Sequence, residues 1–178
     1  MPHFLDWLYG HGWDVYYMQR TGDNAYSDRS RLADGIKNAV AGLKSAGYRN
    51  VVLAGQSSGA TYSMIAAKEN LGLHALILTG PGPSDGPLSF DSALRDAQSN
   101  RFILAHFAKD RTIGQRKSSN LQNILSAKNI PYMNIFEPPG IEGHSGAFQS
   151  TFSKRFGDCI LIFLEPSRKP TGAECNGK

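Results

Sequence analysis

The sequence predicts a three-layer α/β/α domain, in which helices cover both faces of a sheet of about five parallel strands. Short apolar runs alternate with helical patterns at intervals of roughly twenty to thirty residues, which favours parallel pairing through right-handed crossovers. The run at 74–79 is almost continuously apolar, as expected for a strand that is covered on both faces. A chain of 178 residues with 40% hydrophobic content suits one compact domain.

Each predicted element is a short segment with its own periodicity or boundary residues. The predicted strands are rich in β-branched, aromatic or aliphatic residues, and they lie at 13–18, 51–54, 74–79, 101–110 and 131–136. The predicted helices show apolar steps of three and four or a cap residue, and they lie at 2–9, 28–46, 60–70, 92–98, 115–128, 147–155 and 158–164. Asp158 after Gly157 is the predicted N-cap of the last helix. Residues 1–167 form the predicted domain, and 168–178 a flexible tail.

A Gly-x-Ser-x-Gly motif follows the predicted strand at 51–54. It consists of Gly55, Gln56, Ser57, Ser58 and Gly59, and a helical pattern begins directly after it. A strand-to-helix turn holds its central serine at a strained corner, and we expect both glycines to leave room where side chains would collide. Because this short motif also occurs by chance, its position between a strand and a helix is the informative feature.

The motif in this context resembles the nucleophile elbow of the α/β-hydrolases, and the size and strand layout resemble a dienelactone hydrolase. That family implies a triad in the chain order serine, acid, histidine, with the acid and the base on loops after later strands. Asp110 ends the apolar run at 101–110 and resembles the family's acid, while His144 lies in a Gly-His loop after 131–136. The resemblance implies a serine esterase with Ser57 as nucleophile, where a dienelactone hydrolase would carry cysteine.

Alternatives to these assignments stay open at the sequence level. Ser57 could be a turn serine, and Asp110 a helix cap, in which case Glu137 is the substitute acid. His74 and His106 lie inside apolar runs, where a core histidine is the ordinary interpretation, and His3 and His11 precede the elbow. The rival function is a non-catalytic α/β-hydrolase-like domain that binds a small molecule or a partner.

The resemblance begins after the family's first three strands, so the fold is expected to be minimal at its N-terminus. Two arrangements could fill the gap beside the elbow strand. The strand at 13–18 could pair directly with it, which we favour because one chain then satisfies its own backbone groups, or another chain could fill the gap in a homo-oligomer. A start at an internal methionine of a longer protein is a third explanation.

The same absence affects the predicted oxyanion hole. The backbone N–H of Ser58 is the first expected donor, and His3 or Phe4 is the nearest backbone candidate for the second. Losing one such donor commonly costs about 10²–10³ in rate, which predicts a weak esterase. About twenty residues separate the strand at 74–79 from the next one, where lipase-like members insert a lid, so we expect no lid and an open cleft.

Composition argues against other classes of function. The net charge is +4, but the basic residues are scattered, which does not indicate nucleic-acid binding. No apolar run is long enough for a membrane span, and no signal-peptide pattern begins the chain, so we expect a soluble, cytoplasmic protein.

Cys159 and Cys175 could be free, buried or bridged, and free thiols are favoured. No metal-binding spacing or dinucleotide motif occurs, so no cofactor is expected, and the predicted partner is a small ester.

Overall fold

A parallel four-stranded sheet forms the centre of the computed structural model, which describes residues 3–18, 29–81, 90–110 and 115–168. The strands lie in the order β1-β2-β3-β4, and every neighbouring pair is parallel. Their bounds are β1 Val52–Gln56, β2 Ala75–Thr79, β3 Phe102–His106 and β4 Tyr132–Phe136. All four strands therefore end at the same edge of the sheet, where their loops can build one site.

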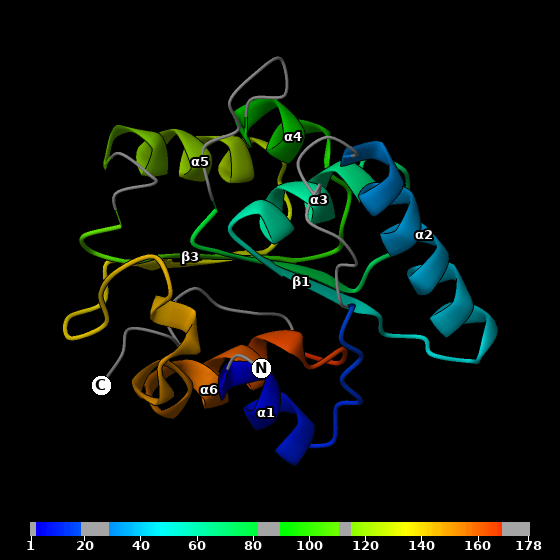
Figure 1. Ribbon diagram of the computed structural model, residues 1–178, viewed down its shortest axis with the longest axis horizontal. Coiled ribbons are helices and arrows are strands. Elements are labelled where there is room, and N and C mark those ends of the chain that lie inside the picture. The colour runs from blue at the N-terminus through cyan, green and yellow to red at the C-terminus, as the bar shows by residue number, and fades with distance from the viewer. Residues whose placement is uncertain (1–2, 19–28, 82–89, 111–114, 169–178) are drawn as a thin grey trace.

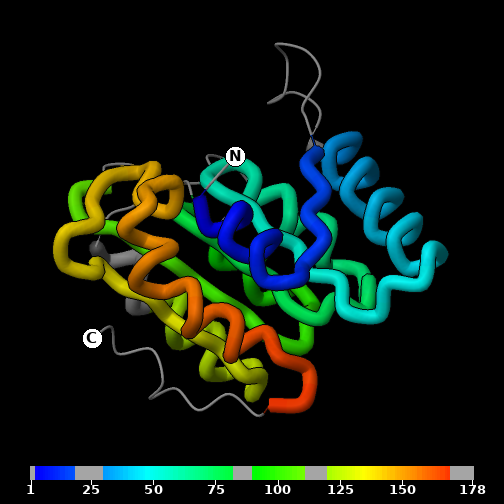
Figure 2. The backbone as a smooth tube through the Cα atoms, turned by 90° about the horizontal axis from the view of Figure 1, so that it is seen from below, coloured from blue at the N-terminus to red at the C-terminus, as the bar shows by residue number. Residues whose placement is uncertain are grey.

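Helices cover both faces of this sheet and give three layers (Figure 1). One layer contains α2, α3, α4 and α5, and the other contains α1 and α6, as the view from below also shows (Figure 2). The bounds are α1 His3–Gly10, α2 Arg29–Ser45, α3 Ser58–Ala66, α4 Phe90–Asp96, α5 Gln115–Ala127 and α6 Ser150–Leu164, with a short 3-10 helix at Gly146–Phe148. The predicted α/β/α architecture is confirmed, with four strands among the described residues instead of about five.

The core divides into two clusters because side chains alternate along each strand. Leu76, Leu78, Phe102 and Leu104 point to the face covered by α2 to α5. Their sequence neighbours Ala75, Ile77, Ile103 and Ala105 belong to the cluster on the α1 and α6 side. Every residue of β2 and β3 is buried, whereas every residue of β1 is only half-buried, in keeping with its place at the edge of the sheet.

The prediction of a strand at 13–18 is wrong, and so is the direct pairing of that segment with β1. Residues 13–18 form no regular element, and in Figure 1 they rise from α1 towards the layer that contains α2. Two of their aromatic side chains contact other rings instead: Trp13 lies over His74 and Tyr16 meets the ring of Tyr48. Aromatic and β-branched content gave the strand signal, but the segment is irregular here and its Tyr16 and Tyr17 are exposed. Among the described residues, β2 is the strand that pairs with β1.

The C-terminal segment forms one helix where the sequence predicted two. Gly157 and Asp158 lie inside α6, so the predicted N-cap role of Asp158 is wrong. A Cβ on Gly157 would come within 2.5 Å of the Trp7 indole nitrogen, so the glycine makes room for α1. Glycine in this helix thus marks a close approach between helices, although it gave the sequence signal of a helix break.

The expectation of free thiols is also wrong, because Cys159 is disulfide-bonded. The chain contains one other cysteine, Cys175, which lies outside the described residues. Residues 169–178 of the predicted tail lie outside them as well. Arg168 is described, and its carbonyl oxygen accepts a hydrogen bond from the Arg101 guanidinium at 3.0 Å. No helix in the described part of the chain combines the length and the apolar character needed to cross a membrane.

Candidate active site

Ser57 occupies a strained corner between β1 and α3. Its φ of 55° and ψ of −125° lie in a region that non-glycine residues rarely adopt. The corner is held from both sides, since the Ser57 N–H donates to Thr79 O of β2 at 3.1 Å and Ser57 O accepts from the Ala60 N–H at 3.0 Å. Strain of this kind at a strand-to-helix turn is typical of a nucleophile elbow, in which the side chain projects above the sheet.

The two glycines of the motif have different roles. A Cβ on Gly55 would lie 2.5 Å from Gly59 O, so the strand and the first turn of α3 approach each other too closely for any side chain at position 55. An added Cβ on Gly59 would meet nothing within 4 Å. The expectation that both glycines prevent a collision therefore holds for Gly55 and is wrong for Gly59.

His144 and Asp110 lie together at the carboxyl edge of the sheet. The His144 Nδ1 is 2.9 Å from Asp110 Oδ2, although 34 residues separate them in the chain. Because a carboxylate only accepts hydrogen bonds, Nδ1 carries the proton in this pair, and Nε2 is the nitrogen that a general base would use. The Asp110 side chain is 3% exposed and that of His144 is 32% exposed, so the acid is enclosed while the imidazole reaches the surface.

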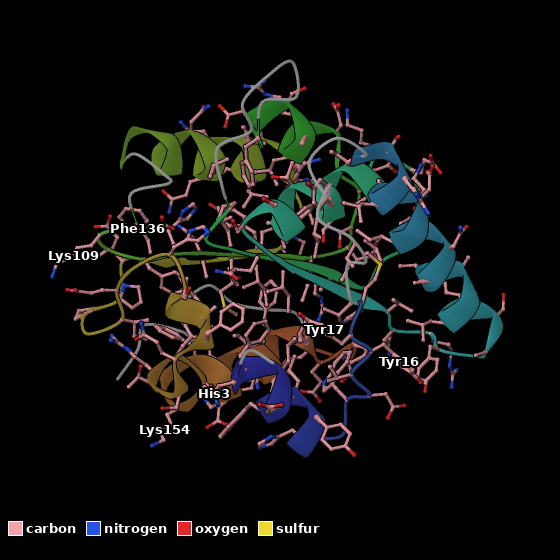
Figure 3. All side chains as sticks on the ribbon, viewed as in Figure 1. His3, Tyr16, Tyr17, Lys109, Phe136 and Lys154 are labelled. Atoms are coloured by element: carbon pink, nitrogen blue, oxygen red, sulfur yellow. The ribbon has the colours of Figure 1, made fainter. Side chains whose placement is uncertain are left out.

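The loops that carry these two residues are joined by backbone and side-chain contacts. Gly143 N–H donates to Ala108 O at 2.7 Å, and Ala108 forms an isolated bridge with Glu142. Next to this bridge, Lys109 Nζ lies 2.6 Å from Glu142 Oε2. The orientation of His144 against Asp110 is therefore supported on several sides, as a preorganised site requires. Lys109 and Phe136 mark this edge of the sheet at the left of Figure 3.

Gly80 lies between the elbow and the His–Asp pair. It follows β2 with a φ of +45°, and a Cβ there would lie 2.9 Å from His144 O and 3.5 Å from Asp110 Oδ2. The residue before it, Thr79, accepts the backbone hydrogen bond of Ser57. The backbone of β2 thus touches both halves of the candidate site, and a side chain at position 80 would push the His144 loop away.

Two histidines predicted to be core residues are buried. His74 is 7% exposed and its Nε2 lies 2.7 Å from Leu164 O. His106 is 4% exposed, and its Nε2 is buried without a hydrogen-bond partner. Burial lowers the pKa of His106 to about 4, partly opposed by the charge of the nearby Asp110. His106 is therefore neutral at ordinary pH.

The remaining predicted site residues are placed as follows. Ser58 is the first residue of α3, so its N–H belongs to the first turn, whose N–H groups lack acceptors within the helix. Phe4 is buried in α1 against Phe152, and His3 begins α1 in the lower layer of Figure 3, so neither has a described contact with the elbow.

Glu137, the substitute acid, follows β4 with a φ of 41°, and the acid that contacts His144 is Asp110. The described residues contain no group of three or more His, Cys, Asp or Glu side chains able to hold a metal ion.

Comparison with solved structures identifies the architecture as that of the α/β-hydrolases, of which the described residues form a part. A protein from Bacillus cereus of no stated function matches with a TM-score of 0.71 and 14% identity, over 91% of this chain and 54% of its own. Esterase B from Lactobacillus rhamnosis matches with a TM-score of 0.57 and 14% identity, over 76% of this chain and 59% of its own. A Klebsiella pneumoniae protein named as a presumed dienelactone hydrolase matches with a TM-score of 0.57 and 15% identity, over 75% and 60%.

These matches establish the fold and not the activity, because the identities are low. This chain spans between 54% and 60% of the length of the three proteins. No family model and no curated protein sequence matches the chain. A statement about its chemistry therefore depends on the geometry of its own residues.

Proposed function

We propose that this chain is a serine hydrolase that cleaves carboxylic esters through Ser57, His144 and Asp110. The observation that carries the proposal is the 2.9 Å contact between His144 Nδ1 and Asp110 Oδ2, at the edge where Ser57 occupies its strained elbow. An enclosed carboxylate beside a half-exposed imidazole favours the tautomer with its proton on Nδ1, so that Nε2 can accept a proton. The esterase name of the Lactobacillus rhamnosis protein agrees with this choice of chemistry.

In the proposed acylation step, His144 Nε2 takes the proton of the Ser57 hydroxyl while Oγ attacks the ester carbonyl carbon. The carbonyl π electrons move to oxygen and form a tetrahedral oxyanion near the Ser58 N–H, at the start of α3 where the helix dipole also favours negative charge. The intermediate then expels the alkoxide, which takes the proton from His144 and leaves as an alcohol. Asp110 stays ionised and stabilises the imidazolium.

Deacylation repeats these steps with water as the nucleophile. His144 removes a proton from water, the hydroxide oxygen attacks the acyl carbon, and Ser57 Oγ leaves with the proton that His144 returns. Esters suit this site better than amides because an alkoxide needs less acid assistance than an amine. With one assigned oxyanion donor, we expect turnover about 10²–10³ below that of an esterase with a complete oxyanion hole.

The proposal is tested by the hydrolysis of p-nitrophenyl acetate, a small activated ester. We expect saturable turnover by the wild-type chain and its loss in Ser57→Ala, which removes the nucleophile but leaves the backbone of the elbow. Ser167→Ala is the matched control, because Ser167 is an exposed serine near the end of the described chain. Equal turnover in wild type and Ser57→Ala would overturn the proposal and favour the non-catalytic binding domain.

A further inference from the structure

A side-chain hydrogen bond links the elbow strand directly to the loop of His144. Gln56, the last residue of β1 and the one before Ser57, donates from Nε2 to the backbone oxygen of His144 at 2.8 Å. The bond joins residues 88 positions apart and is partly buried. The Gly-x-Ser-x-Gly pattern leaves this position unspecified, so no sequence signal pointed to it.

The alternation of β1 explains why this side chain reaches the histidine loop. Val52 and Ala54 pack on the cluster formed with α1 and α6, and Gln56 follows at the same parity, so it projects from the same face of the sheet. The loop of His144 continues into the 3-10 helix, where Ala147 belongs to this cluster. A residue at position 55 would point to the opposite face, which leaves Gln56 as the neighbour of Ser57 that can reach His144 from β1.

The other described bonds of this loop run to different parts of the chain. Gly143 and the His144 ring are tied to the acid loop through Ala108 and Asp110. Gln149 donates to Glu142 O at 2.9 Å from the far side of the loop. These contacts fix His144 relative to Asp110, whereas the bond from Gln56 fixes it relative to the strand that carries Ser57.

We propose that Gln56 is a positioning residue, which sets the distance and angle between the His144 imidazole and the Ser57 hydroxyl by holding the backbone of His144. This inference rests on the proposed function, since it assigns no chemistry to Gln56 itself. Proton transfer between Ser57 and His144 depends steeply on geometry, and a shift of about 1 Å can cost about 10²-fold in rate. A bond to the backbone of the base, made from the residue next to the nucleophile, limits that shift.

Gln56→Met and Gln56→Glu test the proposal in p-nitrophenyl acetate turnover. Methionine keeps the length and removes the donor, so we expect kcat to fall about 10- to 100-fold while KM changes less than about twofold. Glutamate is isosteric, but its carboxylate cannot donate to the His144 carbonyl oxygen, so we expect a similar fall in kcat. Gln98→Met is the matched control, because Gln98 makes the same kind of bond to Lys68 O at 2.9 Å, next to the amino end of β3.

The outcomes separate this proposal from the proposed function. If Ser57→Ala is inactive but Gln56→Met keeps the wild-type kcat, or changes KM alone, the positioning role is wrong and the hydrolase stands. If Gln98→Met lowers kcat as much as Gln56→Met does, the loss of activity does not depend on the contact with His144, and the positioning role is again wrong. If Ser57→Ala keeps wild-type turnover, the proposed function itself fails. Circular dichroism spectra show whether each variant is folded. If Gln56→Met does not fold, the kcat of Gln56→Glu is compared with that of the wild type instead.

Discussion

At the scale of single residues, backbone strain and close approach define the elbow. Ser57 keeps a φ of 55° because β2 holds its N–H and α3 holds its carbonyl oxygen. Gly55 is required by its 2.5 Å approach to Gly59 O, while Gly59 has open space around it. The two glycines of the motif therefore have different structural roles, which the sequence alone does not reveal.

Alanine substitution at the two glycines should separate these roles. We expect Gly55→Ala to lower the free energy of unfolding by about 1–3 kcal/mol, because the added methyl group collides with the backbone of α3. Gly59→Ala lies within α3 and meets nothing, so we expect it to leave stability unchanged or to raise it by up to about 1 kcal/mol. Urea unfolding of the two variants measures the difference, and equal losses at both positions would contradict this account of the elbow.

The carboxylate of Asp110 provides the second prediction at this scale. In Asp110→Asn the side chain keeps its shape but can offer an N–H to His144 Nδ1, which favours the wrong imidazole tautomer. We expect kcat for p-nitrophenyl acetate to fall by about 10⁴, or to the background rate. Asp158→Asn alters an exposed carboxylate of α6 and should keep the wild-type kcat. Retained activity in Asp110→Asn would remove Asp110 from the proposed triad.

At the scale of elements, the sequence predicted most helices and strands because their periodicity was clear. The amphipathic pattern of α2 and the continuous apolar run of β2 both appear close to their predicted bounds. The failures arose where a local signal served a tertiary contact. Trp13 lies over His74 from a segment without regular structure, and Gly157 makes room for Trp7 within a continuous α6. Neither contact could be predicted before the positions of the partner elements were known.

The contact between α1 and α6 gives a prediction on helical glycines. Gly157→Ala should push the Trp7 indole out of its place, and we expect a loss of about 1–3 kcal/mol in the free energy of unfolding together with a change in tryptophan fluorescence. Gly42→Ala is the matched control in α2, where an added Cβ meets nothing, and should stabilise the chain by up to about 1 kcal/mol. A Gly157→Ala variant that is as stable as Gly42→Ala would show that α1 does not depend on this approach.

At the scale of the whole molecule, parallel strands bring distant residues to one edge of the sheet. Ser57, Asp110 and His144 follow β1, β3 and β4, which is why the chain order of the motifs could lead to the prediction of a triad there. The structure brings His144 to Asp110, whereas the supporting contacts of Gln56 and Gly80 carry no sequence signal, since they depend on how three loops meet. The place of β1 at the edge of the sheet also contradicts the predicted pairing with 13–18.

The buried His106 makes the stability of the whole molecule depend on pH. Burial lowers its pKa from 6.5 to about 4, so between these values the unfolded chain binds a proton that the folded chain does not. The contribution of His106 to stability is therefore present above pH 6.5 and lost as the pH falls through this window. At about 1.4 kcal/mol for each pKa unit, the loss amounts to about 3 kcal/mol at pH 4.

Urea unfolding at pH 7 and pH 4 measures this loss. On going from pH 7 to pH 4, the free energy of unfolding should fall by about 3 kcal/mol less in His106→Leu than in the wild type, because leucine has no proton to gain. His11→Gln changes an exposed histidine and should keep the wild-type dependence. The same decrease in His106→Leu and in the wild type would show that His106 does not titrate in this range.

Activation of Ser57 by His144 can be tested by covalent labelling with a serine-directed fluorophosphonate. Digestion and peptide mass analysis then show which residue carries the label. We expect a label on Ser57 in the wild-type chain and its loss in His144→Ala, since the probe reacts with a serine whose proton a base removes. A wild-type chain that stays unlabelled at Ser57, or a label that persists in His144→Ala, would show that His144 does not activate Ser57.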